Sequence, residues 1–387
     1  MRKSRFVSLG VRSIVNVEAL NMVESVGNVV RHRIVPYIVA LESGRYVLRW
    51  VPAVSGECLA HAYQSMLADV ALNNKLPVCY WCSKHEFIKH FDLRFIEHTK
   101  DKGIPYTEDE LKLAKSYANK NKLSLSEIEE IESTIVRNCV VEDVGGFLVQ
   151  QGPTKRTSRF YFSYMVPTED SVASGAVALD NQFFVRHAMT AESYRASDEI
   201  APIQAPYYVQ VGSAVYAYTF ALDLDAIGVS SVSGKQVVAD DEKNRRMVAA
   251  LDALKELLDT RMFGAKLTRF NPVQGYECIV AAISRGIALN VSPPTKSFND
   301  FVCGTVMRAA RALQEVGDAK ARILLWSEDS KVRERLAKLK EELERNDVVK
   351  SVVGEGKEAK LRIEVVDSYS PRDLVDRIKE FLGLSTR

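Results

Sequence analysis

The chain has 387 residues, of which 47% are hydrophobic and 26% charged, and its net charge of +2 is ordinary for a folded globular protein. It contains no run of about 18 apolar residues and no apolar segment behind its basic first residues, so we expect neither a membrane span nor a secretory signal. Six cysteines in this length do not form a disulfide framework, and we expect the reducing cytoplasm as the compartment.

Alternating apolar residues predict a first strand with Val11, Val15 and Val17 on one face. The residues that follow, as far as Arg33, are rich in hydrogen-bond donors and cations, and we expect them to form a loop. A strand that ends in such a loop is a common place for a ligand, and an ordinary solvated loop explains the pattern equally well. The surroundings are basic, because residues 1–50 contain eight Lys and Arg against three Glu.

A hairpin is predicted next, with strands at Val35–Leu41 and Tyr46–Val51. Ser55 is a suitable N-cap for a helix that runs to about Asn73 and places apolar residues on one face. Residues 78–138 differ in character, with few strand signals and many charges, and we predict an inserted helical region there. Its helices are expected near residues 84–98, 107–119 and 124–138.

Strand signals return at Phe147–Gln150 and Arg159–Val166, and residues 187–206 form an excursion without a clear period. Tyr207–Asp223 is apolar on both faces, which predicts a central strand. The last predicted elements are a helix at Asp240–Phe263, a strand at Cys278–Leu289, a helix at Lys331–Glu344, a strand at Lys360–Val366 and a helix at Pro371–Phe381. Strands and helices interleave as in α+β folds, and the elements suit a ferredoxin-like βαββαβ core, the sheet of RRM domains.

Cys79 and Cys82 form a CxxC pair, which has the spacing of two ligands of a tetrahedral zinc ion. Cys139, at the far end of the helical region, is the expected third ligand, because zinc there would join the two ends of the insertion. The fourth ligand stays open among Cys58, His61, His85 and His90. Buried free thiols and a redox pair are the alternatives, and the lack of a surrounding βαβ pattern disfavours the redox pair.

Most enzyme motifs are missing from the sequence, which contains no GxxxxGK(S/T), GxGxxG, HExxH or GxSxG. His32 and His61 could form an acid–base pair for RNA cleavage. Hydrogen-bond donors in a polar binding loop explain these histidines better, so we expect a non-catalytic protein.

Basic clusters provide the main indication of function. They are Arg31-His32-Arg33, Lys155-Arg156-Thr157-Ser158-Arg159, Arg186-His187, and Lys266 with Arg269. Each follows a strand or helix end, so each can point into a shared groove. Arg and Lys contact phosphates and hydroxyls add positioning bonds, neither of which reads base sequence. One cluster alone is a solvated surface, whereas the four together predict a continuous nucleic-acid groove.

Several segments resemble the DevR-type CRISPR-associated autoregulator family, the guide-RNA-coating backbone subunit of archaeal type I-A Cascade. They are VRSIVNVEALNMVESVGNVVRHR (Val11–Arg33), VPAVSGECLAHAYQ (Val51–Gln64), VVEDVGGFL (Val140–Leu148) with KRTSRF (Lys155–Phe160), and VGSAVYAYTFALDLD (Val211–Asp225). The resemblance spans roughly residues 6–310, and the order and approximate spacing of the segments fit the family.

The resemblance implies an RRM-like palm formed by residues 1–77, 139–186 and 207–387, with C-terminal helices in its third part. Residues 78–138 would be the helical fingers and 187–206 the thumb. Expected contacts to the RNA backbone come from Asn28, Arg31, His32, Arg33, Ser55, Gly56, Lys155, Arg156, Ser158, Arg159, Arg186, Lys266 and Arg269. Met189 and Tyr194 of the thumb are expected to wedge between bases.

Such a protein would polymerise along a CRISPR guide RNA, contact other copies of itself and other Cascade subunits, and present the guide for pairing with target DNA. Structural zinc is the expected cofactor. Two other functions stay open. A guide-processing endoribonuclease would use His32 or His61, and an autoregulator would bind duplex DNA, for which the sequence offers no helix-turn-helix.

Overall fold

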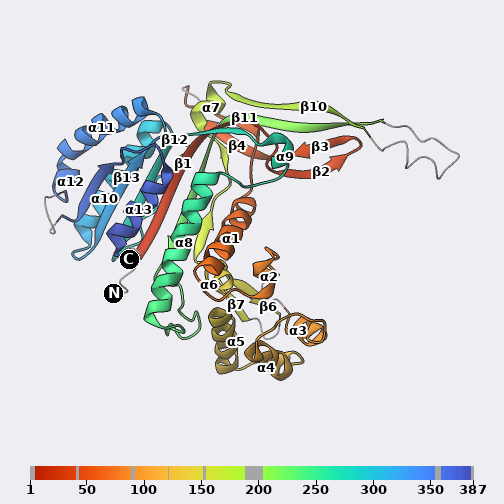
Figure 1. The fold of residues 1–387 in the computed structure, drawn as a ribbon. Coiled ribbons are helices and arrows are strands. Elements are labelled where there is room, and N and C mark those ends of the chain that lie inside the picture. The colour runs from red at the N-terminus through yellow and green to blue at the C-terminus, as the bar shows by residue number, and fades with distance from the viewer. Residues whose placement is uncertain are drawn as a thin grey trace.

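The computed structural model describes residues 5–40, 43–88, 92–120, 122–150, 154–187, 204–353 and 359–384. Its architecture is mixed α/β. A mixed ten-stranded sheet contains a path of neighbouring strands in the order β14-β13-β12-β1-β11-β3-β2, and β8, β9 and β10 also pair with β11. Two smaller sheets each contain two strands. Figure 1 shows the large sheet with helices packed against it and a separate group of small helices at one end.

The centre of the sheet is β1 (Arg5–Glu18), which runs antiparallel to β11 (Gln204–Asp223) and to β12 (Val273–Arg285). The predicted strand and its buried Val11 and Val15 are confirmed, as is the central strand in the second half of the chain. Val17 was placed on the wrong face. It is 53% exposed and has a φ of 57°, because the register to β11 shifts between Val15 and Glu18. A bulge of this kind turns the side chains that follow it.

One face of the sheet is covered by α1 (Gly56–Asn73) and α8 (Asp240–Thr260), whose apolar residues share one core with the buried valines of β1. Ser55 caps α1 as predicted, because its side chain accepts a hydrogen bond from the backbone N–H of Cys58. The buried Tyr63 hydroxyl of α1 donates to the Ala250 carbonyl of α8 at 2.9 Å, which joins the two helices.

The C-terminal part extends the sheet through β13 (Lys320–Trp326) and β14 (Leu361–Val365), which pair in parallel. A second core covers the opposite face, since Val280 and Ala282 of β12 pack with α10 while their neighbours Ile279 and Ala281 face α1 and α8. The predicted helix at 331–344, strand at 360–366 and helix at 371–381 are confirmed. The helices here are α10 (Phe298–Glu315), α11 (Ser330–Arg345), α12 (Asp347–Lys350) and α13 (Pro371–Leu382).

The described part of the region predicted to be helical contains four short helices. They are α2 (Tyr80–Ser83), α3 (Leu93–Thr99), α4 (Glu108–Tyr117) and α5 (Leu125–Asn138). Cys139 follows as the N-cap of α6 (Val140–Gly145). Capping boxes at Thr107 and Ser124 begin α4 and α5, so two of the three predicted helices are confirmed. The prediction of one helix over 84–98 was wrong, because residues 84–88 are not helical and α3 starts at Leu93.

Two long hairpins extend from the sheet toward the same side of the molecule (Figure 1). One pairs β2 (Met22–Val26) with β3 (Val29–His32), where the sequence had predicted a loop. Its residues alternate too weakly in hydropathy to predict a strand, and pairing of β3 with β11 supplies the stabilisation. The other pairs β10 (Val177–His187) with β11. Met189 and Tyr194 lie outside the described residues.

A separate hairpin pairs β4 (Ile34–Ala40) with β5 (Tyr46–Pro52), as predicted. The remaining elements are β6 (Phe147–Val149), β7 (Thr154–Arg156), β8 (Phe160–Phe162), β9 (Val166–Pro167), α7 (Glu169–Ala173) and α9 (Leu267–Phe270). Among the described helices, none is long and apolar enough to cross a bilayer.

Candidate nucleic-acid interface

A groove with a volume of about 930 Å³ runs along α1 and past the C-terminal end of α8. Arg33, Ser55 and His61 line it, together with the connection between α8 and α9. That connection approaches the end of β1 closely, because a side chain at Gly264 (φ 87°) would place its Cβ 2.7 Å from the Leu20 carbonyl oxygen. The groove therefore joins segments from both halves of the chain.

Asn21 holds the basic end of this groove in place. Its side-chain oxygen accepts hydrogen bonds from Nε of Arg33 at 2.9 Å and from the backbone N–H of Ser55 at 2.8 Å. The Arg33 guanidinium is thus fixed beside the first turn of α1, where unpaired backbone N–H groups give a helix its partial positive charge. A cation and a helix N-terminus together favour a phosphate group. Asn21 was not among the predicted site residues, although its polar segment was.

His32 does not line the groove, because its side chain has no exposed surface. Its Nε2 lies 2.8 Å from Oε1 and 2.9 Å from Oε2 of Glu18, and Oε1 also accepts from the Tyr216 hydroxyl at 2.7 Å. Burial alone would lower the pKa of His32, but its contacts with Glu18 outweigh that effect and raise it. The same contacts lower the pKa of Glu18 against the opposing effect of burial. His32 therefore closes a buried ion pair, and direct RNA contact or catalysis by its imidazole does not fit this position.

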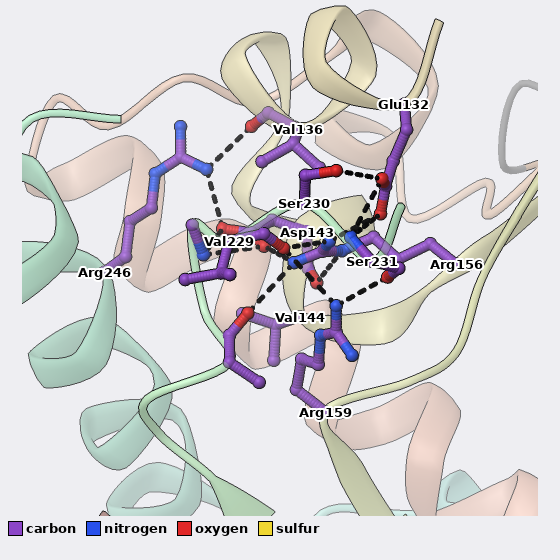
Figure 2. Close-up of polar contacts among 12 residues, drawn as sticks. Glu132, Val136, Asp143, Val144, Arg156, Arg159, Val229, Ser230, Ser231 and Arg246 are labelled. Atoms are coloured by element: carbon purple, nitrogen blue, oxygen red, sulfur yellow. Dashed lines mark hydrogen bonds and ion pairs between the residues drawn. The ribbon is translucent and has the colours of Figure 1, made fainter. Parts of the chain in front are cut away.

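Arg156 also lies in the interior rather than in a groove, with a side chain that has no exposed surface (Figure 2). Its Nη1 donates to Glu132 at 2.9 Å and to the Val229 carbonyl at 2.7 Å, and its Nη2 pairs with Asp143. Arg246 of α8 reaches Asp143 from the other side at 2.8 Å. This network fixes α5 and α6 to β7 and to α8, so the structure assigns Arg156 a structural role in place of the predicted phosphate contact.

The neighbours of Arg156 vary in exposure. Lys155 is exposed, whereas Ser158 donates to the Phe160 carbonyl at 2.6 Å within its own turn. Arg159 is partly buried, and its Nη2 donates to the Ser231 hydroxyl at 2.8 Å. Burial and the nearby Arg156 charge lower the pKa of Arg159. Figure 1 places β7 beside α5 and α6, at the end of α1 away from α9, so this cluster lies apart from the groove.

Other predicted residues gather at the end of the molecule that carries the two long hairpins. Asn28 lies in the exposed β2–β3 turn and its carbonyl accepts from the backbone N–H of Tyr208 at 2.8 Å, while Arg31 is paired with Glu24 at 3.0 Å. Lys266 and Arg269 are exposed at α9, and Arg269 donates to the Tyr207 hydroxyl at 2.6 Å. The backbone of Arg186 pairs with Ala205 in the β10–β11 ladder. The predicted single groove is thus divided between this end and the base of the helical region.

Gly56 has a packing role in this structure, since a Cβ there would lie 2.7 Å from the Phe162 carbonyl oxygen. Ser55 is almost buried and serves as the cap of α1. Both residues still form the backbone turn that begins the helix at the groove.

Aromatic rings at the same end were missed by the sequence analysis. Phe183 of β10, 57% exposed, lies with its ring centroid 5.3 Å from that of Tyr208 on β11. On the neighbouring positions, Phe184 stacks with Tyr207 at 5.6 Å and meets Phe270 of α9 edge-on. Exposed rings beside arginine and lysine are typical of surfaces on which unpaired bases stack. The adjacent pair Phe183 and Phe184 places an aromatic ring on each face of a strand, and this is the sequence signal that could have revealed them.

The three cysteines expected to bind metal do meet. The sulfur atoms of Cys79, Cys82 and Cys139 lie within 4.8 Å of one another, and this cluster could hold a metal ion. Among the described residues, none of the fourth-ligand candidates Cys58, His61 and His85 belongs to the cluster, and His90 lies outside the described ranges.

Comparison with known proteins gives the class to which this protein belongs. Residues 9–305 match the family described as CRISPR-associated negative auto-regulator DevR/Csa2, so this is a CRISPR-associated protein. The chain belongs to the DevR/Csa2 family. This membership confirms the family that the sequence segments had indicated.

Two curated relatives come from Saccharolobus solfataricus. The CRISPR-associated aCascade subunit Cas7/Csa2 2 is 34% identical over 79% of this chain and 87% of its own length. The CRISPR-associated protein Cas7/Csa2 1 is 36% identical over 80% of this chain and 89% of its own length. Among solved structures, a chain of a CRISPR RNA-guided surveillance complex in a pre-nicking state superposes with a TM-score of 0.47 and 12% identity, covering 97% of this chain and 99% of that chain.

Proposed function

We propose that this chain is a non-catalytic subunit that binds a CRISPR guide RNA, polymerises along it as the backbone of a type I-A Cascade complex, and presents the guide for pairing with target DNA. Membership of the DevR/Csa2 family and the similarity to a named aCascade subunit support the complex. The observation that carries RNA binding is the groove in which Asn21 fixes Arg33 beside the N-terminus of α1.

The strand order supports an RRM-like palm. Four strands lie in the order β12-β1-β11-β8, and they are antiparallel throughout. Helix α1 lies between β1 and β8 in the chain, and α8 between β11 and β12, on the same face of the sheet. This is the strand order and the pattern of helix connections expected of a βαββαβ unit. In this proposal residues 78–138 are the fingers and the β10–β11 hairpin with residues 187–206 is the thumb.

Residues of the groove and of the hairpin end would contact the guide. Arg33, Lys266 and Arg269 would bind phosphates without reading sequence, and Asn28 in the neighbouring turn would add a hydrogen bond. Phe183 would stack on a base next to the thumb. Such contacts leave the Watson–Crick edges of most bases free, so that base pairing supplies the specificity for target DNA.

The β4–β5 hairpin supports contact with further copies of the chain. Its residues alternate, and Ile38 opposite Leu48 and Pro36 opposite Trp50 share one outer face. These side chains are exposed, Ile38 and Trp50 by 65% each. A contiguous apolar face on an exposed two-stranded sheet is typical of a protein–protein contact. We assign this face to the neighbouring subunit in the filament.

The position of His32 supports a non-catalytic role, because its imidazole is enclosed with Glu18 and cannot approach a scissile phosphate without opening the core. His61 is exposed on α1 and packs edge-on against Phe87 at 5.1 Å, apart from the buried pair. The description of the family as an auto-regulator keeps duplex DNA as the competing ligand to be tested.

The test measures binding of the full chain to unstructured single-stranded RNA and to duplex DNA over a series of salt concentrations and RNA lengths. We expect preference for RNA and a number of bound chains that rises stepwise with RNA length. Arg33→Ala should weaken binding, whereas Arg345→Ala, an exposed arginine on α11, should not. Duplex preference would support the regulator, and RNA breakdown would support the nuclease.

A further inference from the structure

A buried thiol cluster lies where the helical region joins the palm. Cys79 is the N-cap of the single turn of α2, Cys82 lies within that turn, and Cys139 stands between α5 and α6. Their three sulfur atoms lie within 4.8 Å of one another, and the residues are 9%, 1% and 0% exposed. Sulfur atoms around a tetrahedral zinc are about 3.8 Å apart, from the Zn–S bond length of about 2.3 Å. Small side-chain adjustments would therefore bring all three to one ion.

Three buried sulfur atoms this close together suit a shared metal ion. Cysteine binds a metal as its thiolate, and a cation is the group that balances several thiolates in the interior of a protein.

Glu142 is the candidate for a fourth ligand beside the cluster. It is 1% exposed and lies three residues after Cys139 in α6, on the same side of the helix. Its carboxylate lies outside the 4.8 Å group of the three sulfur atoms, so ligation requires a change of its rotamer toward the ion. Two or three thiolates with one further ligand form the usual structural zinc site, and carboxylate oxygen is an accepted ligand. Soft sulfur ligands exclude Mg²⁺ and Ca²⁺ as the natural occupants.

We propose that Cys79, Cys82 and Cys139 bind one structural zinc ion, with the Glu142 carboxylate as the fourth ligand. The site would act as a clamp on the insertion. Cys79 and Cys82 lie at its beginning and Cys139 at its end, and the backbone N–H of Val140 already donates to the Pro77 carbonyl at 2.9 Å beside them. A metal bond across two ends so distant in sequence restricts the unfolded chain and fixes the exit angle of the helices.

Metal analysis of the full chain, purified without chelators from zinc-supplemented cells, is the first test. We expect about one zinc per chain in the wild type and in Cys303→Ser, a partly buried cysteine of α10 outside the cluster. Cys82→Ser should lower zinc affinity by more than about 100-fold, and Glu142→Gln by about 10–100-fold. Binding of wild-type strength in Glu142→Gln would overturn the fourth ligand.

A second test needs no variant, so misfolding cannot obscure it. The wild-type chain, stripped with a chelator and titrated with Co²⁺ alone, should show cobalt–thiolate charge-transfer absorption that saturates at about one ion per chain and is displaced by Zn²⁺. Metal removal should also raise the rate of proteolysis between residues 93 and 138. Addition of zinc should return that rate to its starting value. The site would be overturned if the chain contained no zinc and showed no cobalt–thiolate absorption. A Cys79–Cys82 disulfide found by mass spectrometry would overturn it as well. RNA binding is measured separately, so its failure does not bear on this result.

Discussion

Replacement of Arg156 by alanine separates a structural arginine from an RNA-binding one. The side chain donates through Nε to the Asp143 carbonyl at 2.9 Å, through Nη1 to Glu132 and Val229, and through Nη2 to Asp143 and the Ala226 carbonyl. Truncation leaves two carboxylates in the interior with one cation removed.

The expected cost follows from what remains after truncation. Breaking a buried ion pair by removal of one partner destabilises a protein by about 3–5 kcal/mol. Asp143 would keep Arg246 and the backbone N–H of Gly228 at 2.9 Å, and Glu132 would keep the Ser230 hydroxyl at 2.8 Å. These contacts offset part of the loss, so we expect about 3 kcal/mol, at the lower end of that range.

Urea unfolding monitored by circular dichroism gives the free energy of unfolding, and RNA binding over a salt series gives the number of phosphate contacts. Lys155→Ala is the matched control, since it removes the neighbouring exposed cation and should change stability by less than about 0.5 kcal/mol. For Arg156→Ala we expect a loss of stability with an unchanged salt slope in the protein that remains folded. A loss below about 1 kcal/mol together with a smaller salt slope would refute the structural role and restore the phosphate contact.

Four further predictions address the groove, the buried pair and the assembly face. Arg33→Ala should reduce the slope of log K against log salt by about 0.7 per lost phosphate contact, without loss of stability. Phe183→Ala should weaken single-stranded RNA binding by about 1–3 kcal/mol, and an unchanged affinity would exclude it from the interface. The stability difference between wild type and His32→Gln should be largest between pH 4.5 and 6.5, the ordinary pKa values of the Glu18 and His32 side chains. It should shrink as pH rises through the raised pKa of His32, and again as pH falls through the lowered pKa of Glu18, so a difference that grows above neutral pH would contradict the buried pair. Trp50→Asp should abolish the stepwise rise in bound chains with RNA length while one chain still binds a short RNA, and retained stepwise binding would exclude the β4–β5 face.

Local signals explain why much of the fold was predictable. The helix after Ser55 and the helices with capping boxes at Thr107 and Ser124 are specified by residues within one turn of their starts, and the structure confirms them. The C-terminal helix at Pro371 likewise combines a Pro in its first turn with a strong apolar stripe. The CxxC pair and its third cysteine were also found from spacing alone.

The misplaced site residues depend on contacts between distant parts of the chain. Arg156 stands in a basic cluster in the sequence, and its carboxylate partners, Glu132 and Asp143, are 24 and 13 residues away. His32 meets Tyr216 through Glu18, which follows the bulge that also exposed Val17. Charge pattern along a sequence does not distinguish an arginine that faces water from one that closes a buried network, because both need polar neighbours.

Helix α6 connects two buried polar clusters, the thiol cluster and the Arg156 network. Its N-cap is Cys139, which belongs to the thiol cluster, and Asp143 on the same helix pairs with Arg156 and Arg246. A shift of α6 therefore cannot leave either cluster unchanged. Since α6 follows directly on α5 and packs against α1, which lines the groove, α6 links the helical region to the proposed RNA-binding end. In the proposed filament every subunit would repeat one geometry along the guide, and we infer that the two clusters at the base of the insertion serve that requirement.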